Sequence, residues 1–260
     1  MNAIEQIDQN VFRLTTPYKD IYTTVCIIKT DSGAMLFDAA SWDSDAEEYL
    51  LPFLRGAGVG QEELKYIFIS HDHTDHSGGL KGLLPHFPNA VVVSGSKRLH
   101  ELYPETHFIT PADGETLLDV LRVVHIPGHT QDSAAIFDTR TGMLISGDCL
   151  QLWGIFGSGN WGANIRFPVE HISAVERLHD LPISRILAAH DYHPLGHFYE
   201  GSEQVEKALH SCIAPLDRIK ELLSLYPDED DQQICARYNE GGALPTLGAH
   251  VVTAVRAADI

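Results

Sequence analysis

The chain has 260 residues, 44% of them hydrophobic, and a formal net charge of −18. Its length and composition suit one large folded domain, with or without a small appendage. The negative charge would repel phosphate backbones, which excludes nucleic acid as an expected partner, and no apolar run reaches the roughly 18 residues of a transmembrane helix, so no membrane partner is expected.

The N-terminus and the cysteines indicate the compartment. The first residues lack the basic start and apolar core of a signal peptide, so we expect a cytoplasmic protein. The four cysteines, Cys26, Cys149, Cys212 and Cys235, are widely spaced and form no C-x-x-C pair. They are typical of packing residues or free thiols rather than of a disulfide framework.

The first part of the chain predicts paired strands, a helix and a further strand. Apolar, partly β-branched runs predict strands at 11–14, 23–28, 34–37 and 64–70. A helix is predicted at 44–57, because Asp43 or Ser44 can cap its start and glycines at 56 and 58 stop it. The turn Asp31-Ser32-Gly33 joins its flanking strands as a hairpin. Asp38 follows this hairpin at a strand end.

The strand at 64–70 ends in a dense group of ionisable side chains, His71-Asp72-His73-Thr74-Asp75-His76. Burying such a group is costly without a compensating partner, and a divalent cation binds neutral imidazole and carboxylate. In an extended segment His71 and His73 point the same way, so they could bind one ion while Asp75 and His76 face a second. The alternative is a solvated polar loop without a function. Ser77-Gly78-Gly79 then permits a tight turn or a close backbone approach.

Later strands also end in histidine or aspartate. Further elements are predicted as helices at 80–86, 96–103 and 171–180, and as strands at 90–94, 121–126, 134–138, 143–146 and 185–189. His129 follows one strand in a Gly-His-Thr turn, Asp148 follows another in Gly-Asp, and His190 follows the last. The strand pair that ends at Asp148 parallels the hairpin that ends at Asp38, so the chain has two similar halves.

Together these motifs resemble the signature of the metallo-β-lactamase superfamily: H-x-H-x-D-H, then Gly-His-Thr, Gly-Asp and a last histidine. All seven positions occur in order between residues 71 and 190. The resemblance implies an α/β (α+β) fold, the αββα sandwich of two mixed β-sheets flanked by helices. It also implies metal ions at one edge, between the two sheets. It further implies that Asp38 supports the ligand loop, with a simple turn residue as the alternative.

The resemblance further implies a role for each ligand. The first metal would be held by His71, His73 and His129, the second by Asp75, His76 and His190, with Asp148 as the bridge. The expected cofactors are two divalent ions, zinc before iron or manganese, which share a hydroxide that attacks the substrate. Asp148 and Asp75 are the expected catalytic residues, because Asp75 could also accept a proton or orient the hydroxide.

Several groups within the superfamily fit less well. Its β-lactamases usually carry cysteine where Asp148 stands, and its flavodiiron proteins glutamate where His73 stands. The chain is more similar to hydroxyacylglutathione hydrolases and N-acyl-homoserine lactonases. It lacks the lactonase tyrosine after Asp148, and its tail is acidic where glutathione-binding relatives use basic residues.

We therefore predict a dinuclear metal-dependent hydrolase acting on a small-molecule ester, thioester or lactone. The alternatives are a mononuclear iron sulfur (persulfide) dioxygenase that uses the first three histidines, a small-molecule phosphodiesterase, and a metal-binding protein without catalysis.

Two segments are candidates for substrate contact. Residues 151–169 interleave glycines with aromatic residues, which indicates either a mobile loop over a pocket or a partly buried surface loop. The candidate residues are Trp153 and Trp161 in this segment, and Tyr192 and His193 after the last ligand.

The C-terminal part predicts helices only. Apolar residues recur at helical spacing over 202–226, and two shorter helices are expected near 232–238 and 246–258. We expect a metallo-β-lactamase-fold catalytic domain over 1–200 and a helical extension over 201–260 that packs on it. The extension could also cap the pocket or form a homodimer contact.

Overall fold

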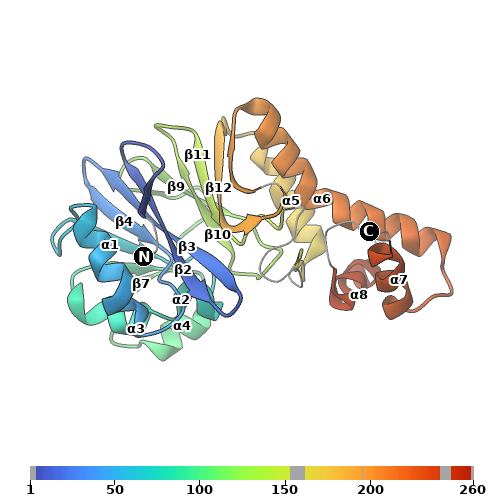
Figure 1. Ribbon diagram of the computed structural model, residues 1–260, viewed down its shortest axis with the longest axis horizontal. Helices are drawn as coiled ribbons and strands as arrows, with labels where there is room; N and C mark the ends of the chain where they lie inside the picture. Colours follow the sequence, from blue (N-terminus) through green and yellow to red (C-terminus); the bar gives the residue numbers. More distant parts are fainter. Residues whose placement is uncertain (1–3, 153–161, 195, 241–246, 259–260) are drawn as a thin grey trace. The chain divides into compact units, whose positions relative to one another are not determined.

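The computed structural model describes residues 4–152, 162–194, 196–240 and 247–258. The chain has the predicted α/β fold of two mixed β-sheets flanked by helices (Figure 1). One sheet has seven strands in the order β1-β2-β3-β4-β5-β6-β7, and the other has six in the order β13-β12-β11-β10-β9-β8. The chain divides into two compact units: unit 1 is Met1–Val124 with Ala134–Arg140, and unit 2 is His125–Ser133 with Thr141–Ile260. A boundary at residue 200 stays a prediction.

The strands of unit 1 come mostly from the predicted apolar runs. They are β1 (Ile4–Gln6), β2 (Val11–Tyr18), β3 (Ile21–Thr30), β4 (Gly33–Phe37), β5 (Leu64–Phe68), β6 (Val91–Val93), β7 (Phe108–Ile109), β8 (Thr116–Leu117), β9 (Leu121–His125) and β10 (Ala134–Asp138). The predicted hairpin joins β3 and β4, with Thr30 opposite Gly33. Strands β4 to β7 are parallel. The short strands β1, β7 and β8 were not predicted, because each has at most two apolar residues, whereas the equally short β6 is entirely apolar.

Parallel pairing of β4 and β5 positions the first candidate ligands. Asp38 follows β4 and Ser70 follows β5, and Leu36 of β4 lies opposite Ile67 of β5. Because parallel strands end at the same edge of a sheet, the two loops meet there. Asp38 itself has a positive φ of 64°, a conformation that aspartate tolerates better than most residues.

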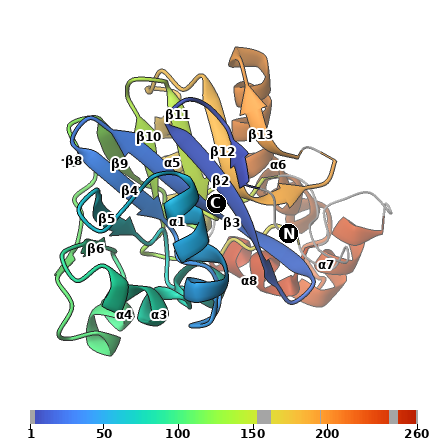
Figure 2. The same cartoon turned by 60° about the vertical axis from the view of Figure 1, so that its left-hand side comes forward.

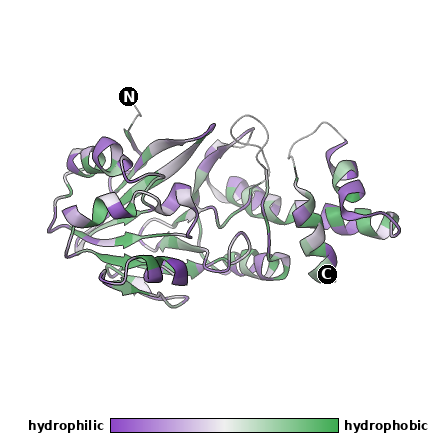
Figure 3. Cartoon of the chain, turned by 90° about the horizontal axis from the view of Figure 1, so that it is seen from below, coloured by the Kyte–Doolittle hydropathy of each residue, from purple (hydrophilic) through white to green (hydrophobic). Residues whose placement is uncertain are grey.

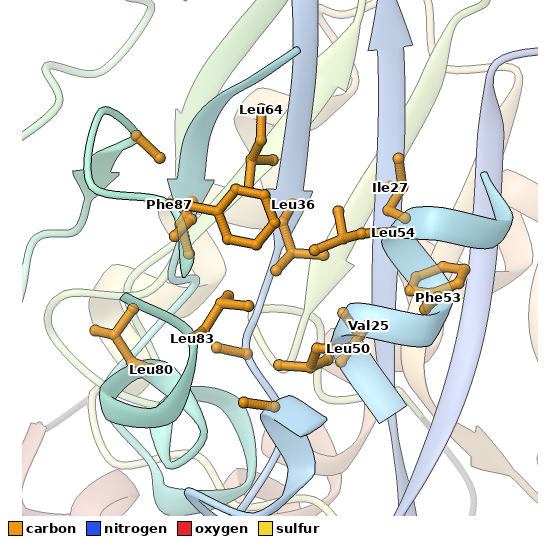
Figure 4. Packing of buried hydrophobic residues seen from close by; sticks show 14 of the residues in the cluster. Val25, Ile27, Leu36, Leu50, Phe53, Leu54, Leu64, Leu80, Leu83 and Phe87 are labelled. Atoms are coloured by element: carbon orange, nitrogen blue, oxygen red, sulfur yellow. The ribbon is translucent and has the colours of Figure 1, made fainter. Parts of the chain in front are cut away.

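The helices of unit 1 are short and bury one face each. They are a π-helical turn η1 (Ala46–Leu50) that continues into α1 (Leu51–Gly56), then α2 (Thr74–Ser77), α3 (Leu80–Leu83), a 3₁₀ turn η2 (Leu84–His86) and α4 (Lys97–Leu102). Figure 2 shows α1, α3 and α4 beside the strands of the first sheet. In Figure 4 the side chains of Leu50, Phe53 and Leu83 meet those of Val25 and Leu36, and all five are at most 1% exposed.

Two glycines allow the loop after β4 to lie directly against the α2–α3 region. A Cβ on Gly78 would collide with the carbonyl oxygen of Ser41, and one on Gly79 with that of Ala39. Backbone hydrogen bonds join the same segments: the amide of Gly79 donates to Ala39 O at 3.0 Å. The predicted close approach after His76 is therefore confirmed.

Unit 2 contains three strands of the second sheet and the long helices. These are β11 (Met143–Gly147), β12 (Arg185–Tyr192), β13 (Gly196–Glu200), α5 (Pro168–Leu178), α6 (Ser202–Leu225), α7 (Asp231–Asn239) and α8 (Ala249–Ala258). β11 and β12 are parallel, and β13 returns antiparallel to β12. The predicted C-terminal helices are confirmed, whereas β13 was not predicted.

The helices of unit 2 share an apolar core. Figure 3 shows them striped with hydrophilic and hydrophobic residues, as expected for amphipathic helices. The buried stripes of α6, α7 and α8 enclose Ala163 and Ile165, which are 2% and 0% exposed. Within the ranges that the structure describes, no helix is both long and apolar enough to cross a bilayer.

Candidate metal centre

Unit 1 brings four predicted ligands together in one loop. His71 follows β5, His73 precedes α2 in an extended conformation, and Asp75 and His76 lie in α2. The ring centroid of His71 lies 4.5 Å from that of His73 and 4.3 Å from that of His76. His71 and His76 are fully buried. Helix α2 was not predicted, because four residues are too few for a helical pattern.

One buried carboxylate orients two of these histidines. Nδ1 of His76 donates to Oδ2 of Asp38 at 2.7 Å, and the hydroxyl of Ser70 donates to the same oxygen at 3.0 Å. The Ser70 oxygen then accepts from Nδ1 of His71 at 3.1 Å. Burial raises the pKa of Asp38, and its interaction with His76 and the hydrogen bonds from His76 and Ser70 oppose that shift.

The remaining acids of the loop differ in their surroundings. Oδ2 of Asp75 accepts from the Thr23 hydroxyl at 3.1 Å and lies 3.5 Å from Nε2 of His76. Asp72 instead accepts from the Ser96 hydroxyl and the Arg98 guanidinium, both at 2.9 Å. Although burial works against ionisation, these hydrogen bonds lower the pKa of Asp72. Asp72 therefore anchors the loop, in agreement with its omission from the predicted ligands.

Unit 2 brings the other three predicted ligands together from separate parts of the chain. Asp148 follows β11, His190 lies near the end of β12 and His129 lies in the turn after Gly128. Nε2 of His190 is 3.0 Å from Oδ1 of Asp148, and Nε2 of His129 is 3.6 Å from Oδ2. Nε2 of His190 also lies 3.3 Å from Oδ2, so the Asp148 carboxylate is close to both histidines. All three side chains are buried.

The turn that carries His129 is fixed by the backbone of a later segment. The amides of Arg166 and Phe167 donate to Gly128 O at 2.8 and 3.0 Å, and Nδ1 of His129 donates to Asn164 O at 2.8 Å. His171 fills the space beside Gly128. Burial lowers the pKa of His171 to about 4, so it is a neutral core residue near neutral pH.

The chemistry of this donor set fits divalent transition metals. Nδ1 of His71, His76 and His129 is engaged by an oxygen acceptor. A neutral imidazole that donates from Nδ1 carries its lone pair on Nε2, the form that binds a metal. The described residues thus include His and Asp groups able to bind a metal ion.

Sequence reasoning found every member of these two groups but missed most of their supports. Asp38 was named as a candidate support, whereas Ser70, Gln151, Asn164 and His250 were given no role. Gln151 carried a usable signal, because it is one polar residue within the apolar run Cys149-Leu150-Gln151-Leu152.

The structure describes two of the four residues predicted to contact substrate. Trp153 and Trp161 lie outside the described residues. Tyr192 is fully buried, with its ring centroid 6.2 Å from that of His190, and His193 is exposed. Their contact with a substrate stays a prediction.

Comparison with known proteins identifies the family of the chain. A family model described as the metallo-beta-lactamase superfamily matches residues 19–190. A hydroxyacylglutathione hydrolase of Nostoc sp. is 30% identical over 148 residues, 54% of this chain and 56% of the relative. One from Cyanothece sp. is 31% identical over 138 residues, 51% and 52%. The chain thus spans about half the length of the curated relatives it matches.

Solved structures share the fold. A metallo-beta-lactamase family protein of Thermus thermophilus has a TM-score of 0.64 at 20% identity, covering 97% of this chain and 92% of its own. A metallo beta lactamase of Erythrobacter litoralis has a TM-score of 0.60 at 18% identity, with coverages of 80% and 95%. These likenesses establish the fold alone. Since the family model covers more than half of the chain, the protein belongs to the metallo-beta-lactamase superfamily.

Proposed function

We propose that the protein is a dinuclear metal-dependent hydrolase of a small ester, thioester or lactone. The observation that carries the proposal is the orientation of the histidines: His71, His76 and His129 each use Nδ1 to donate to an oxygen. This leaves Nε2 as the metal-binding atom. A solvated polar loop needs no such arrangement of buried imidazoles.

The proposed ligand sets follow the superfamily signature. His71, His73 and His129 would hold one ion, and Asp75, His76 and His190 the other. Asp148 would bridge them, which is supported by its buried carboxylate lying 3.0 Å from Nε2 of His190 and 3.6 Å from Nε2 of His129. Family membership supports this assignment of ligands, because the seven positions occur in the order of the superfamily signature.

The proposed chemistry divides between the ions and the side chains. Bound divalent ions would supply an activated water and polarise the substrate carbonyl. Asp75, whose Oδ2 is held by the Thr23 hydroxyl, would accept the proton released during attack. Zinc suits the histidine-rich set, and iron or manganese are the alternatives.

The substrate class is proposed from the relatives. They are named hydroxyacylglutathione hydrolases, and a hydroxyacylglutathione is a thioester. Residues 201–260 are rich in acidic side chains, which does not favour an anionic thiol such as glutathione as the leaving group. Neutral thioesters, esters and lactones are therefore preferred. The cytoplasmic location and a homodimer stay predictions.

Metal content tests the proposal first. The protein is purified without chelator or nickel affinity, its metals are counted by mass spectrometry, and thioester, ester and lactone panels are assayed. We expect about two zinc ions per chain and turnover that chelation abolishes. One iron per chain with oxygen uptake on a persulfide would replace the proposal with the dioxygenase, and release from a phosphodiester alone would replace it with the phosphodiesterase. Bound metal without turnover on any panel would reduce it to metal binding.

A further inference from the structure

Residues 163–167, here the support segment, lie between the candidate ligand His129 and the C-terminal helices. The segment accepts the Nδ1 proton of His129 at Asn164 O and donates two amides to Gly128 O. Three hydrogen bonds thus hold the His129 turn against the support segment. Ala163 and Ile165 are buried on either side of Asn164, so this part of the segment is not an exposed loop tip.

Gln151 links the support segment to the other ligand of this unit. Its Oε1 accepts from the Asn164 amide at 2.7 Å, and its Nε2 donates to Asp148 O at 2.8 Å. Gln151 is 1% exposed, so water does not compete for either bond. One side chain therefore joins the backbone at Asp148 to the residue that orients His129.

The C-terminal helices hold the opposite side of the support segment. Oδ1 of Asn164 accepts from Nε2 of His250, the second residue of α8, at 2.8 Å. Ala163 and Ile165 pack in one apolar cluster with residues of α6, α7 and α8, among them Leu216 and Val251. The position of the Asn164 backbone is thus fixed on one side by Gln151 and on the other by the C-terminal helices α6, α7 and α8.

We propose that Gln151, Asn164 and His250 are positioning residues for His129 and Asp148, so that docking of the C-terminal helices sets how tightly the protein retains metal. The inference rests on the proposed metal centre. It follows from the hydrogen-bond series His129–Asn164–His250, in which displacement of α8 moves the acceptor that selects the His129 tautomer. Outer partners of this kind change metal affinity by about 10–100-fold when they are lost.

The test uses the full chain and two readouts. Gln151→Met keeps the length of the side chain but removes both bonds, and His250→Ala removes the bond from α8. His250→Gln restores an N–H donor, and His210→Ala replaces an exposed histidine of α6 as the matched control. Zinc affinity is measured by competition with a chromophoric chelator. The His129 tautomer is measured in the metal-free protein by NMR of nitrogen-labelled histidine.

We expect zinc affinity to fall about 10–100-fold in Gln151→Met and about tenfold in His250→Ala. His250→Gln should recover most of the loss, and His210→Ala should match the wild type. The metal-free wild type should show His129 protonated at Nδ1, and Gln151→Met should show a mixture. The surface variants of His250 keep the test decisive if the buried Gln151 variant does not fold.

If the wild type binds zinc and both His250→Ala and Gln151→Met bind it with the same affinity, the inference is overturned and the proposed function stays intact. A loss in His250→Ala that His250→Gln does not recover would also overturn it, because the hydrogen bond would not be the cause. A wild-type protein that binds no zinc or other divalent ion would instead overturn the proposed function, and the inference with it.

Discussion

The two ligand groups, one in each unit, are built in opposite ways. In unit 1 the four candidate ligands fall within six residues of sequence, and one carboxylate, Asp38, orients two of their imidazoles through Nδ1 of His76 and the Ser70 hydroxyl. In unit 2 the three candidate ligands come from three separate parts of the chain, and a backbone carbonyl, Asn164 O, orients His129.

This difference determines which substitutions would disturb the ligand geometry of each group. A compact ligand loop depends on one ionisable support, so a single substitution at Asp38 disturbs two histidines. A dispersed group depends on the packing that brings its segments together, so its weak points are a tight turn at Gly128 and the contacts of the support segment. Four substitutions test this contrast, from the largest expected effect to the smallest.

Asp148→Ala tests the dispersed group at its carboxylate. As a proposed ligand, Asp148 should matter more than any support, so we expect loss of at least one metal ion per chain and nearly all activity. The loss of metal affinity should exceed the roughly 100-fold upper limit expected when a residue that only supports a ligand is replaced. Asp228→Ala, an exposed carboxylate of the same unit, is the control. Full activity with full metal content in Asp148→Ala would contradict the bridging role.

Asp38→Asn tests the compact group at its one support. The asparagine NH₂ group can point at Nδ1 of His76, where it would face another N–H donor. This favours the His76 tautomer that carries its proton on Nε2, which does not bind a metal through that atom. We expect metal affinity to fall about 10–100-fold, measured by chelator competition. Asp45→Asn is the matched control, since buried Asp45 accepts from the amides of Ser41 and Trp42. Equal effects in both variants would show that Asp38 has only a structural role.

Gly128→Ala tests the turn of the dispersed group. A Cβ there would lie 2.6 Å from Cβ and 2.8 Å from Cγ of His171, and φ is +156°. We expect the free energy of unfolding of the metal-free protein to fall by about 1–3 kcal/mol, measured by denaturant titration. Gly201→Ala has a positive φ but nothing within 4 Å, so it separates backbone strain from collision. If the two variants lose equal stability, collision with His171 is not the cause.

His193→Ala should have the smallest effect. His193 is exposed and lies three positions after the candidate ligand His190. Metal content should therefore stay at the wild-type value in His193→Ala, whereas His190→Ala should lose metal. Any change should appear as a higher KM with kcat unchanged, as expected for a group that contacts only substrate. Loss of metal in His193→Ala would show that the ligand set of unit 2 was misassigned.

Much of the fold followed from the sequence because its signals are local. Apolar runs predicted β2 to β6 and β9 to β12, and helical spacing predicted α6. The short elements β7, β8 and α2 were missed, because their two to four residues include too few apolar positions to show a strand or helix pattern. β13 was missed since Gly196 to Glu200 shows no apolar alternation.

The sequence by itself determined the family and the identity of the candidate ligands, since each ligand directly follows a strand or lies in a short motif with fixed spacing. Only the tertiary structure decided what orients them. The partners in the bonds His76–Asp38, His129–Asn164 and Asn164–His250 are 38, 35 and 86 residues apart. Such pairs are selected by strand register and by the packing of the C-terminal helices, which local periodicity does not encode.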